Sequence, residues 1–278
     1  MKQKKRSFPR KIHLLEREIK RHRSVFAVYL VLRGIVVFSL VMACVRGEYD
    51  HAFLCLLVLV LFLLPTLVQQ NFGIEFPSTL QIIILVFIFA AEILGELQCY
   101  YIHYEHWDTL LHTVWGFLCA AVGYSLVDIL NRNERFQIHL SPLYLSLVAF
   151  CFSMTIGVLW EFFEFSMDRL FLLDMQKDTV LHTISSVMLD GTNSNIPVTI
   201  KNITDLSVNG QSLGLGGYLD IGLYDTMEDL FVNFIGALIF SLIGYFSARK
   251  HAKNKLIDNL VPRVAEPNAD PPPDTPVP

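Results

Sequence analysis

Acidic side chains and one histidine lie near the ends of long apolar segments of this sequence, where they could bind a metal ion. Ionisable residues inside apolar segments are costly and rare, and by default they indicate function. They form four groups: Glu92 with Glu96, Asp108 with His112, Glu161 with Glu164 and Asp168, and Asp225 with Asp229 and Asn233. Oxygen ligands with one imidazole suit Mg²⁺, Mn²⁺, Ca²⁺ or Zn²⁺, so the cofactor predicted by these residues is a divalent cation.

Each group can present its polar atoms on a single helix face. Neighbouring members of every group are three or four residues apart, and residues at that spacing lie above one another on a helix. Each group is therefore a polar stripe on one side of an apolar helix. The five cysteines show no CxxC spacing, so they predict neither a thiolate metal site nor a disulfide framework.

The elements that carry these groups are transmembrane helices. A span needs about 20 mostly apolar residues. The stretches that meet or nearly meet this requirement are residues 25–45, 52–68, 80–97, 109–126, 142–162 and 226–246. The second is short, but Pro65 could kink it and let it continue toward Gln70. We therefore predict an all-α membrane protein, a bundle of about six transmembrane helices.

The distribution of Lys and Arg predicts how the bundle is oriented. Most of the 22 Lys and Arg residues precede residue 25, lie between the fourth and fifth stretches, or follow the sixth. With six spans these positions share one side, and basic residues favour the cytoplasm. We expect a protein of the cell membrane with both termini cytoplasmic. The charged N-terminus has no cleavage site after its first apolar run, which we interpret as the first span.

Three segments lie outside the spans. Residues 1–24 form a basic cytoplasmic segment, whose positions 11–23 could be an amphipathic surface helix or a solvated arm. Residues 165–224 form a long external loop of the domain 25–246, with a strand near 196–200 and a small β-hairpin at Asn209-Gly210, a favoured type I′ turn pair. Residues 247–278 form a cytoplasmic tail whose Pro-rich end is predicted to be disordered.

Because alternate spans run in opposite directions, all four polar groups reach the outer side and predict one outward-facing acidic pocket. The candidate metal ligands are Asp108, His112, Glu161, Glu164, Asp225 and Asp229. The candidates for a catalytic role are Asp229, His112 and Glu161. Glu92, Glu96, Asn233 and Arg33 would complete the pocket. Several carboxylates so close together cannot all ionise without a cation or shared protons.

Each of these residues also has a simpler interpretation. Asp108 and Asp225 could cap the starts of their helices, and Glu161 with Glu164 could face solvent at a helix end. His112 could be a hydrogen-bonded core histidine. Arg33, inside the first span, could reach toward the inner surface, or it could pair with Glu92, which we favour.

The sequence resembles the YjdF-type bacterial inner-membrane proteins from about residue 80 to 245. The resemblance is carried by 106–117 (HWDTLLHTVWGF), 160–164 (WEFFE) and 224–245 (YDTMEDLFVNFIGALIFSLIGY). It implies a fold and a membrane location and assigns no activity. The insert at 192–217 departs from the shorter members of that family. In this chain it could bind a partner or act as a lid.

Two shorter patches are similar to the VanZ-like membrane proteins, which are associated with glycopeptide antibiotic resistance. These patches are Asp108 with His112, and Asp229 with Asn233 and Gly236. The glutamine that usually follows that family's acidic helix is missing here. The resemblance implies a role facing the cell envelope and no specific reaction.

Three classes of function fit these observations. The first is a metal-dependent enzyme that acts on an envelope lipid or precursor head group at the outer leaflet. The second is a sensor or binding protein, which would need the same polar pocket. The third is an ion-coupled transporter, which the one-sided polar groups and the lack of a repeat disfavour. The expected partners are the lipid bilayer and a lipid or precursor ligand, with no nucleic acid; the sequence identifies no protein partner.

Overall fold

Six helices of the chain are long and apolar enough to cross a membrane, which confirms the predicted fold. The computed structural model describes residues 23–131, 140–192, 194–250 and 254–264. Within them the candidate spans are Arg23–Arg46, Tyr49–Asn71, Ser78–Leu97, Trp107–Leu130, Pro142–Phe171 and Leu223–Arg249. The predicted basic segment, except for its last two residues, and the predicted disordered end lie outside the described residues.

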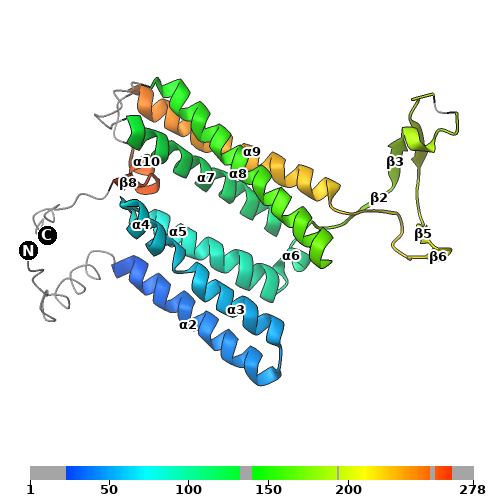
Figure 1. Cartoon of the computed structure of the whole chain (residues 1–278), viewed down its shortest axis with the longest axis horizontal. Helices are drawn as coiled ribbons and strands as arrows, with labels where there is room; N and C mark the ends of the chain where they lie inside the picture. Colours follow the sequence, from blue (N-terminus) through cyan, green and yellow to red (C-terminus); the bar gives the residue numbers. More distant parts are fainter. Residues whose placement is uncertain (1–22, 132–139, 193, 251–253, 265–278) are drawn as a thin grey trace, which may run out of the picture.

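The spans form two packed groups (Figure 1). One group consists of α2 (Arg23–Arg46), α3 (Tyr49–Leu61) and α5 (Ser78–Ile88), and the other of α7 (Trp107–Asn131), α8 (Pro142–Phe171) and α9 (Leu223–Lys250). The long insert between α8 and α9 projects from one end of the bundle, which we call the insert end. The opposite end, where α2 begins and α9 finishes, is the tail end.

Glycines let α7, α8 and α9 approach closely. A Cβ atom on Gly236 of α9 would collide with the backbone of Thr113 on α7, and one on Gly116 would lie 2.8 Å from Oδ1 of Asn233. The hydroxyl of Ser153 on α8 donates a hydrogen bond to the carbonyl of Gly116 at 2.7 Å. Small residues at helix contacts are typical of membrane bundles, because lipid provides no hydrophobic force between helices.

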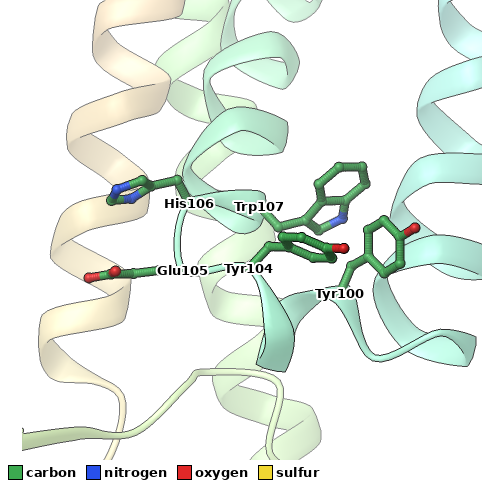
Figure 2. Close-up of a pocket in the computed structure, with 5 residues that line it drawn as sticks. All are labelled: Tyr100, Tyr104, Glu105, His106 and Trp107. Atoms are coloured by element: carbon green, nitrogen blue, oxygen red, sulfur yellow. The ribbon is translucent and has the colours of Figure 1, made fainter.

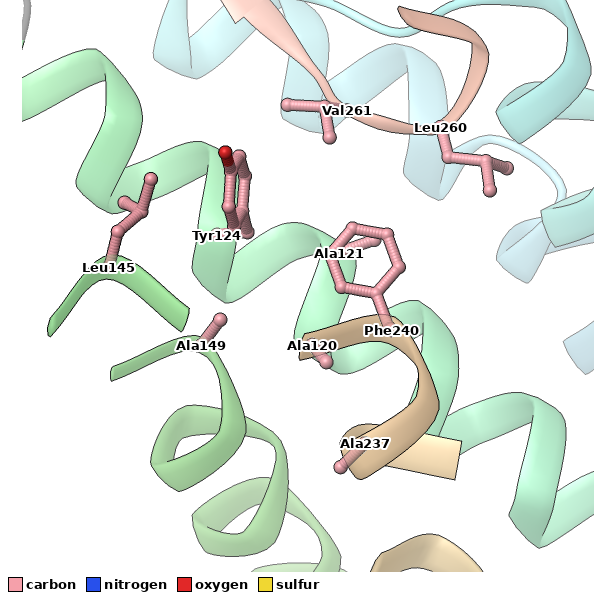
Figure 3. Close-up of a cluster of buried hydrophobic side chains, with 9 residues drawn as sticks. All are labelled: Ala120, Ala121, Tyr124, Leu145, Ala149, Ala237, Phe240, Leu260 and Val261. Atoms are coloured by element: carbon pink, nitrogen blue, oxygen red, sulfur yellow. The ribbon is translucent and has the colours of Figure 1, made fainter. Parts of the chain in front are cut away.

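An apolar cluster closes the tail end of this group (Figure 3). Its members are Ala120, Ala121, Tyr124, Leu145, Ala149, Ala237, Phe240, Leu260 and Val261. The last two belong to the tail, where α10 (Lys255–Leu260) precedes β8 (Arg263–Val264), which pairs antiparallel with β1 (Ile74–Glu75). Ser125 of α7 also donates to the carbonyl of Pro262 at 2.7 Å. The start of the predicted tail is therefore packed against the bundle.

The second and third spans are irregular. The second breaks after α3 and resumes as α4 (Leu64–Phe72), with Pro65 in its first turn. The predicted kink and continuation toward Gln70 are therefore confirmed, and the helix runs on to Phe72. The third changes from α5 into a π-helix, η1 (Phe89–Leu97), which the sequence analysis did not predict. π-Helical turns are uncommon and occur frequently at functional sites.

Three two-stranded ribbons make up the insert. Its stalk pairs β2 (Thr179–Leu181) with β7 (Tyr218–Asp220), and its outer part pairs β3 (Thr183–Ser186) with β4 (Val198–Lys201). The predicted hairpin is confirmed, because β5 (Ser207–Val208) pairs with β6 (Gln211–Ser212) around Asn209 and Gly210. Those two residues have φ values of 53° and 79°, as a type I′ turn requires.

The close contact between α7 and α9 predicts that Gly236→Ala destabilises the protein. The added methyl group must displace backbone, which costs about 1–3 kcal/mol for an overpacked site. Thermal unfolding in detergent should therefore begin at a lower temperature. The control is Gly34→Ala in α2, where a Cβ atom meets open space. Equal unfolding temperatures for the two variants would contradict this packing.

Candidate functional site

Three helices bring five of the predicted site residues together near the insert end. Asp108 and His112 come from the first two turns of α7, Glu161 and Glu164 from the last turns of α8, and Asp229 from the start of α9. They form two groups, Asp108–His112–Asp229 and Glu161–Glu164–Asp229, in each of which one ligand atom per residue lies within 4.8 Å of the others. Asp229 belongs to both groups.

The imidazole of His112 lies between two carboxylates. Its Nε2 atom is 3.6 Å from Oδ1 of Asp108, one turn earlier on the same helix, and 3.5 Å from Oδ2 of Asp229. Both distances exceed those of good hydrogen bonds. The three side chains therefore face a common point without a tight contact between them.

The carboxylates deepest in the site are buried and incompletely paired. Glu161, Glu164 and Asp229 are exposed to only 5%, 6% and 2%, and one carboxyl oxygen of each has no hydrogen-bond partner among the described residues. A buried acceptor without a partner costs about 1–3 kcal/mol, and more when it is charged. A proton or a cation must therefore compensate these oxygens.

Asn233 forms the floor below Asp229, one turn further along α9. It is 1% exposed and lies between Gly116 of α7 and Gly157 of α8, neither of which leaves room for a Cβ atom. Its Nδ2 atom is 3.5 Å from the sulfur of Met154, and its Oδ1 atom has no partner among the described residues. The glycines therefore create the space that this amide occupies.

Asp168 and Asp225 hold the loop that follows α8. The carboxylate of Asp168 accepts the backbone N–H groups of Met175 and Gln176 at 2.7 and 2.9 Å, and Asp225 accepts that of Lys177 at 2.8 Å. The side chain of Gln176 donates to the hydroxyl of Thr226. Asp225, a predicted ligand, belongs to neither of the two groups around Asp229.

Tyr101, in α6 (Tyr100–His103), connects η1 to the site, and the sequence analysis missed it. Its ring packs over Gly95, between Glu92 and Glu96 in sequence. Burial raises the pKa of the Tyr101 phenol well above its ordinary value. Four carboxylates raise it further, namely Asp108, Glu96, Glu92 and Glu164. Tyr101 therefore lies within electrostatic range of acidic residues of η1, α7 and α8, and no sequence pattern singled it out.

Two basic residues lie differently from what the sequence suggested. Lys177, which no sequence pattern singled out, has its Nζ atom 6.0 Å from the centre of the Tyr101 ring. Arg33 donates to the hydroxyl of Tyr29 and covers its ring at 5.4 Å. The favoured ion pair between Arg33 and Glu92 is wrong, since no such pair forms within the described part of the chain. Arg33 instead finds a partner one turn away on its own helix.

An aromatic pocket of about 340 Å³ opens beside the start of α7. Its lining residues are Tyr100, Tyr104, Glu105, His106 and Trp107. The ring of Tyr100 lies 4.7 Å from that of Tyr104 and 4.9 Å from that of Trp107. Figure 2 shows the three rings turned toward one another, with Glu105 and His106 turned the other way. Because the rings contact one another at these distances, we interpret them as interfacial aromatic packing.

Comparison with known proteins gives a family and no close relative. The model of a family described as "Predicted membrane protein (DUF2238)" matches residues 27–250. The match includes all six spans almost completely and every residue of the site. No curated protein and no solved structure matches the chain.

The anchoring of the loop predicts the effect of Asp168→Ala. Hydrogen bonds to a charged acceptor contribute about 1.5–3 kcal/mol, so their loss should speed local opening of the loop by about tenfold or more. Hydrogen–deuterium exchange at the amides of Met175 and Gln176 measures this opening. The control is Asp174→Ala, which removes an exposed carboxylate of the same loop. Unchanged exchange in Asp168→Ala would show that the loop is held by other contacts.

Proposed function

Since the chain belongs to the DUF2238 family of predicted membrane proteins, we propose a membrane-embedded function for it: a metal-dependent enzyme that acts on an envelope lipid or precursor head group. A divalent cation, Mg²⁺, Mn²⁺, Ca²⁺ or Zn²⁺, binds between α7, α8 and α9. Two observations on the same three carboxylates support this proposal. One oxygen of each lies within 4.8 Å of the others, and one oxygen of each is buried without a hydrogen-bond partner among the described residues. Those oxygens belong to Glu161, Glu164 and Asp229.

A cation fits this site better than protons alone. Protons could neutralise the carboxylates, but each protonated carboxyl group would then need an acceptor for its O–H. One cation instead accepts electron pairs from several oxygens at once. Within each of the two groups the ligand atoms lie within 4.8 Å of one another, as metal–oxygen distances of about 2.0–2.6 Å allow. Asp229 and His112 serve as ligands, and Glu161 is placed to act as ligand or base.

The chemistry proposed is hydrolysis or transfer at a head group. A divalent cation can polarise a phosphoryl oxygen and lower the pKa of a bound water. Lys177, above Tyr101, adds a positive charge near the insert end, where it would attract an anionic head group. The resemblances to the YjdF-type and VanZ-like proteins remain predictions and identify no reaction.

The site faces the outside of the cell in this proposal. It lies at the insert end, whereas α2 begins and α9 finishes at the tail end. Most Lys and Arg residues of the sequence precede α2, follow α9 or lie between α7 and α8. Basic residues favour the cytoplasmic side, so the tail end lies in the cytoplasm of a cell-membrane protein, and the insert lies outside. A head group in the outer leaflet is then within reach of the site.

A binding or sensing role is the second candidate, and the insert favours it. The insert exposes large apolar side chains in the connection between β3 and β4, among them Met188 at 89% and Ile196 at 63%. Such residues are typical of surfaces that bind a partner. A transporter is less well supported, because the polar groups lie at one end and the apolar cluster of Figure 3 fills the other.

The proposed orientation predicts the labelling of two engineered cysteines. In a variant without the five native cysteines, Ser185→Cys on the insert should react with a membrane-impermeant maleimide in intact cells. Lys255→Cys in α10 should react only after the cells are opened. The reverse pattern would place the site on the cytoplasmic side and remove the outer-leaflet substrate from the proposal.

The enzyme proposal predicts cation-dependent release of head groups. The purified full chain is incubated with an extracted envelope-lipid pool in detergent, and released phosphate and head groups are measured by mass spectrometry. Release should stop when the cation is chelated, return when it is restored, and fall about 100-fold or more in Asp229→Asn. The matched control is Glu228→Gln, which alters the exposed neighbour of Asp229 that accepts from Thr109. A wild-type protein that retains metal and releases nothing would favour the binding role.

A further inference from the structure

We infer that the site holds two divalent cations at once, bridged by the carboxylate of Asp229; this inference rests on the proposed metal-dependent function. The first ion is bound by Asp108, His112 and Asp229. The second is bound by Glu161, Glu164 and Asp229. A two-ion centre specifies the chemistry more narrowly than one ion does, because paired ions are typical of reactions at phosphorus.

The geometry supports two ions because the ligands separate into two sets. Each set brings three ligand atoms within 4.8 Å of one another, and the only member that the sets share is Asp229. The first set comes from α7 and α9, and the second from α8 and α9. A carboxylate has two oxygens and about four lone-pair directions, so that of Asp229 can serve an ion on each side.

The unpaired oxygens point to ligands independently of the number of acidic residues. Glu161, Glu164 and Asp229 are more than nine-tenths buried, and each has a carboxyl oxygen without a hydrogen-bond partner in the described ranges. Two of these oxygens belong to Glu161 and Glu164 of α8, and the third belongs to Asp229 of α9, the residue that both sets share. A single ion in the first set would leave those of Glu161 and Glu164 uncompensated.

The charge of the site also favours two ions. The two ligand sets contain four carboxylates and one imidazole. Two divalent cations balance four ionised carboxylates, whereas one cation leaves two negative charges in a dry interior, which is costly. Within the described part of the chain, the ion pairs formed by these carboxylates are those of Asp108 and Asp229 with His112. No Lys or Arg there forms a salt bridge with them.

The reaction that two bridged ions serve is hydrolysis of a phosphate ester or anhydride. Ions about 3.5–4 Å apart stabilise both the attacking and the leaving oxygen of an in-line displacement. A water oxygen forms the new bond to phosphorus while the bond to the leaving oxygen breaks. One proton of that water goes to a carboxylate of the site, which then returns a proton to the leaving oxygen. The substrate class is therefore a phosphorylated lipid or precursor head group.

Mn²⁺ is the ion that suits both sets. The first set contains an imidazole and the second only carboxylates, and Mn²⁺ accepts oxygen ligands readily while tolerating nitrogen. It also has an electron paramagnetic resonance signal that changes when two ions share a bridge. Mn²⁺ alone, without substrate, is therefore the probe for the experiment.

The test counts Mn²⁺ ions on the full chain in detergent after the native metal has been removed with a chelator. Equilibrium dialysis followed by elemental mass spectrometry should give two ions per wild-type chain, with an exchange-coupled resonance spectrum. The variant Asp108→Asn/His112→Gln should keep one ion, and Glu161→Gln/Glu164→Gln should keep the other, each with the spectrum of an isolated ion. Asp229→Asn should weaken both sites, and the control Glu228→Gln should bind two.

The wild-type count decides the inference even if a variant fails to fold, which circular dichroism and gel filtration would reveal. Two coupled ions support it. One ion per wild-type chain overturns the two-ion centre and leaves the proposed metal-dependent function standing. Two ions without coupling overturn the bridge at Asp229. No bound ion overturns both the inference and the proposed function.

Discussion

The burial of three carboxylates between α7, α8 and α9 is the constraint on which the rest of this structure depends. Glu161, Glu164 and Asp229 sit where water is nearly excluded, and an uncompensated charge there would cost several kcal/mol. The helices must therefore stay close enough for these three carboxylates to share the cation or protons that compensate their charge. Glycines at positions 116, 157 and 236 allow that close approach. The chemistry of the site therefore depends on the packing of small residues between the helices.

Much of the bundle could be predicted because its signals are local. Apolar length gives the spans, and spacings of three or four residues place Asp108 with His112 on one face. Alternation of direction then brings the ends of four spans together. Only tertiary contacts, however, decide which polar residues meet, and Asp225 shows the limit. Its spacing from Asp229 resembles that of a ligand pair, yet its carboxylate accepts the backbone N–H of Lys177 in the loop after α8.

Other features could not be predicted from sequence for identifiable physical reasons. The change from α5 to η1 leaves the apolar pattern intact, so no residue type marks it. Tyr101 is selected by the space above Gly95, which exists only once η1 has formed. The tail around Leu260 looks polar and short, but it packs against α5, α7 and α9 and joins their apolar cluster. Arg33 had a plausible acidic partner in sequence and a nearer tyrosine in space.

The insert and the site share their anchoring residues, which connects the two parts of the molecule. The stalk strand β2 begins two residues after Lys177, and β7 ends three residues before α9. Asp225 and Thr226, one turn before Asp229, hold the loop through Lys177 and Gln176. Gly222, at a φ of 90°, leaves the room that the side chain of Gln176 needs. A movement of the stalk must therefore act on the first turn of α9, and the carboxylate common to both ligand sets lies on the next turn.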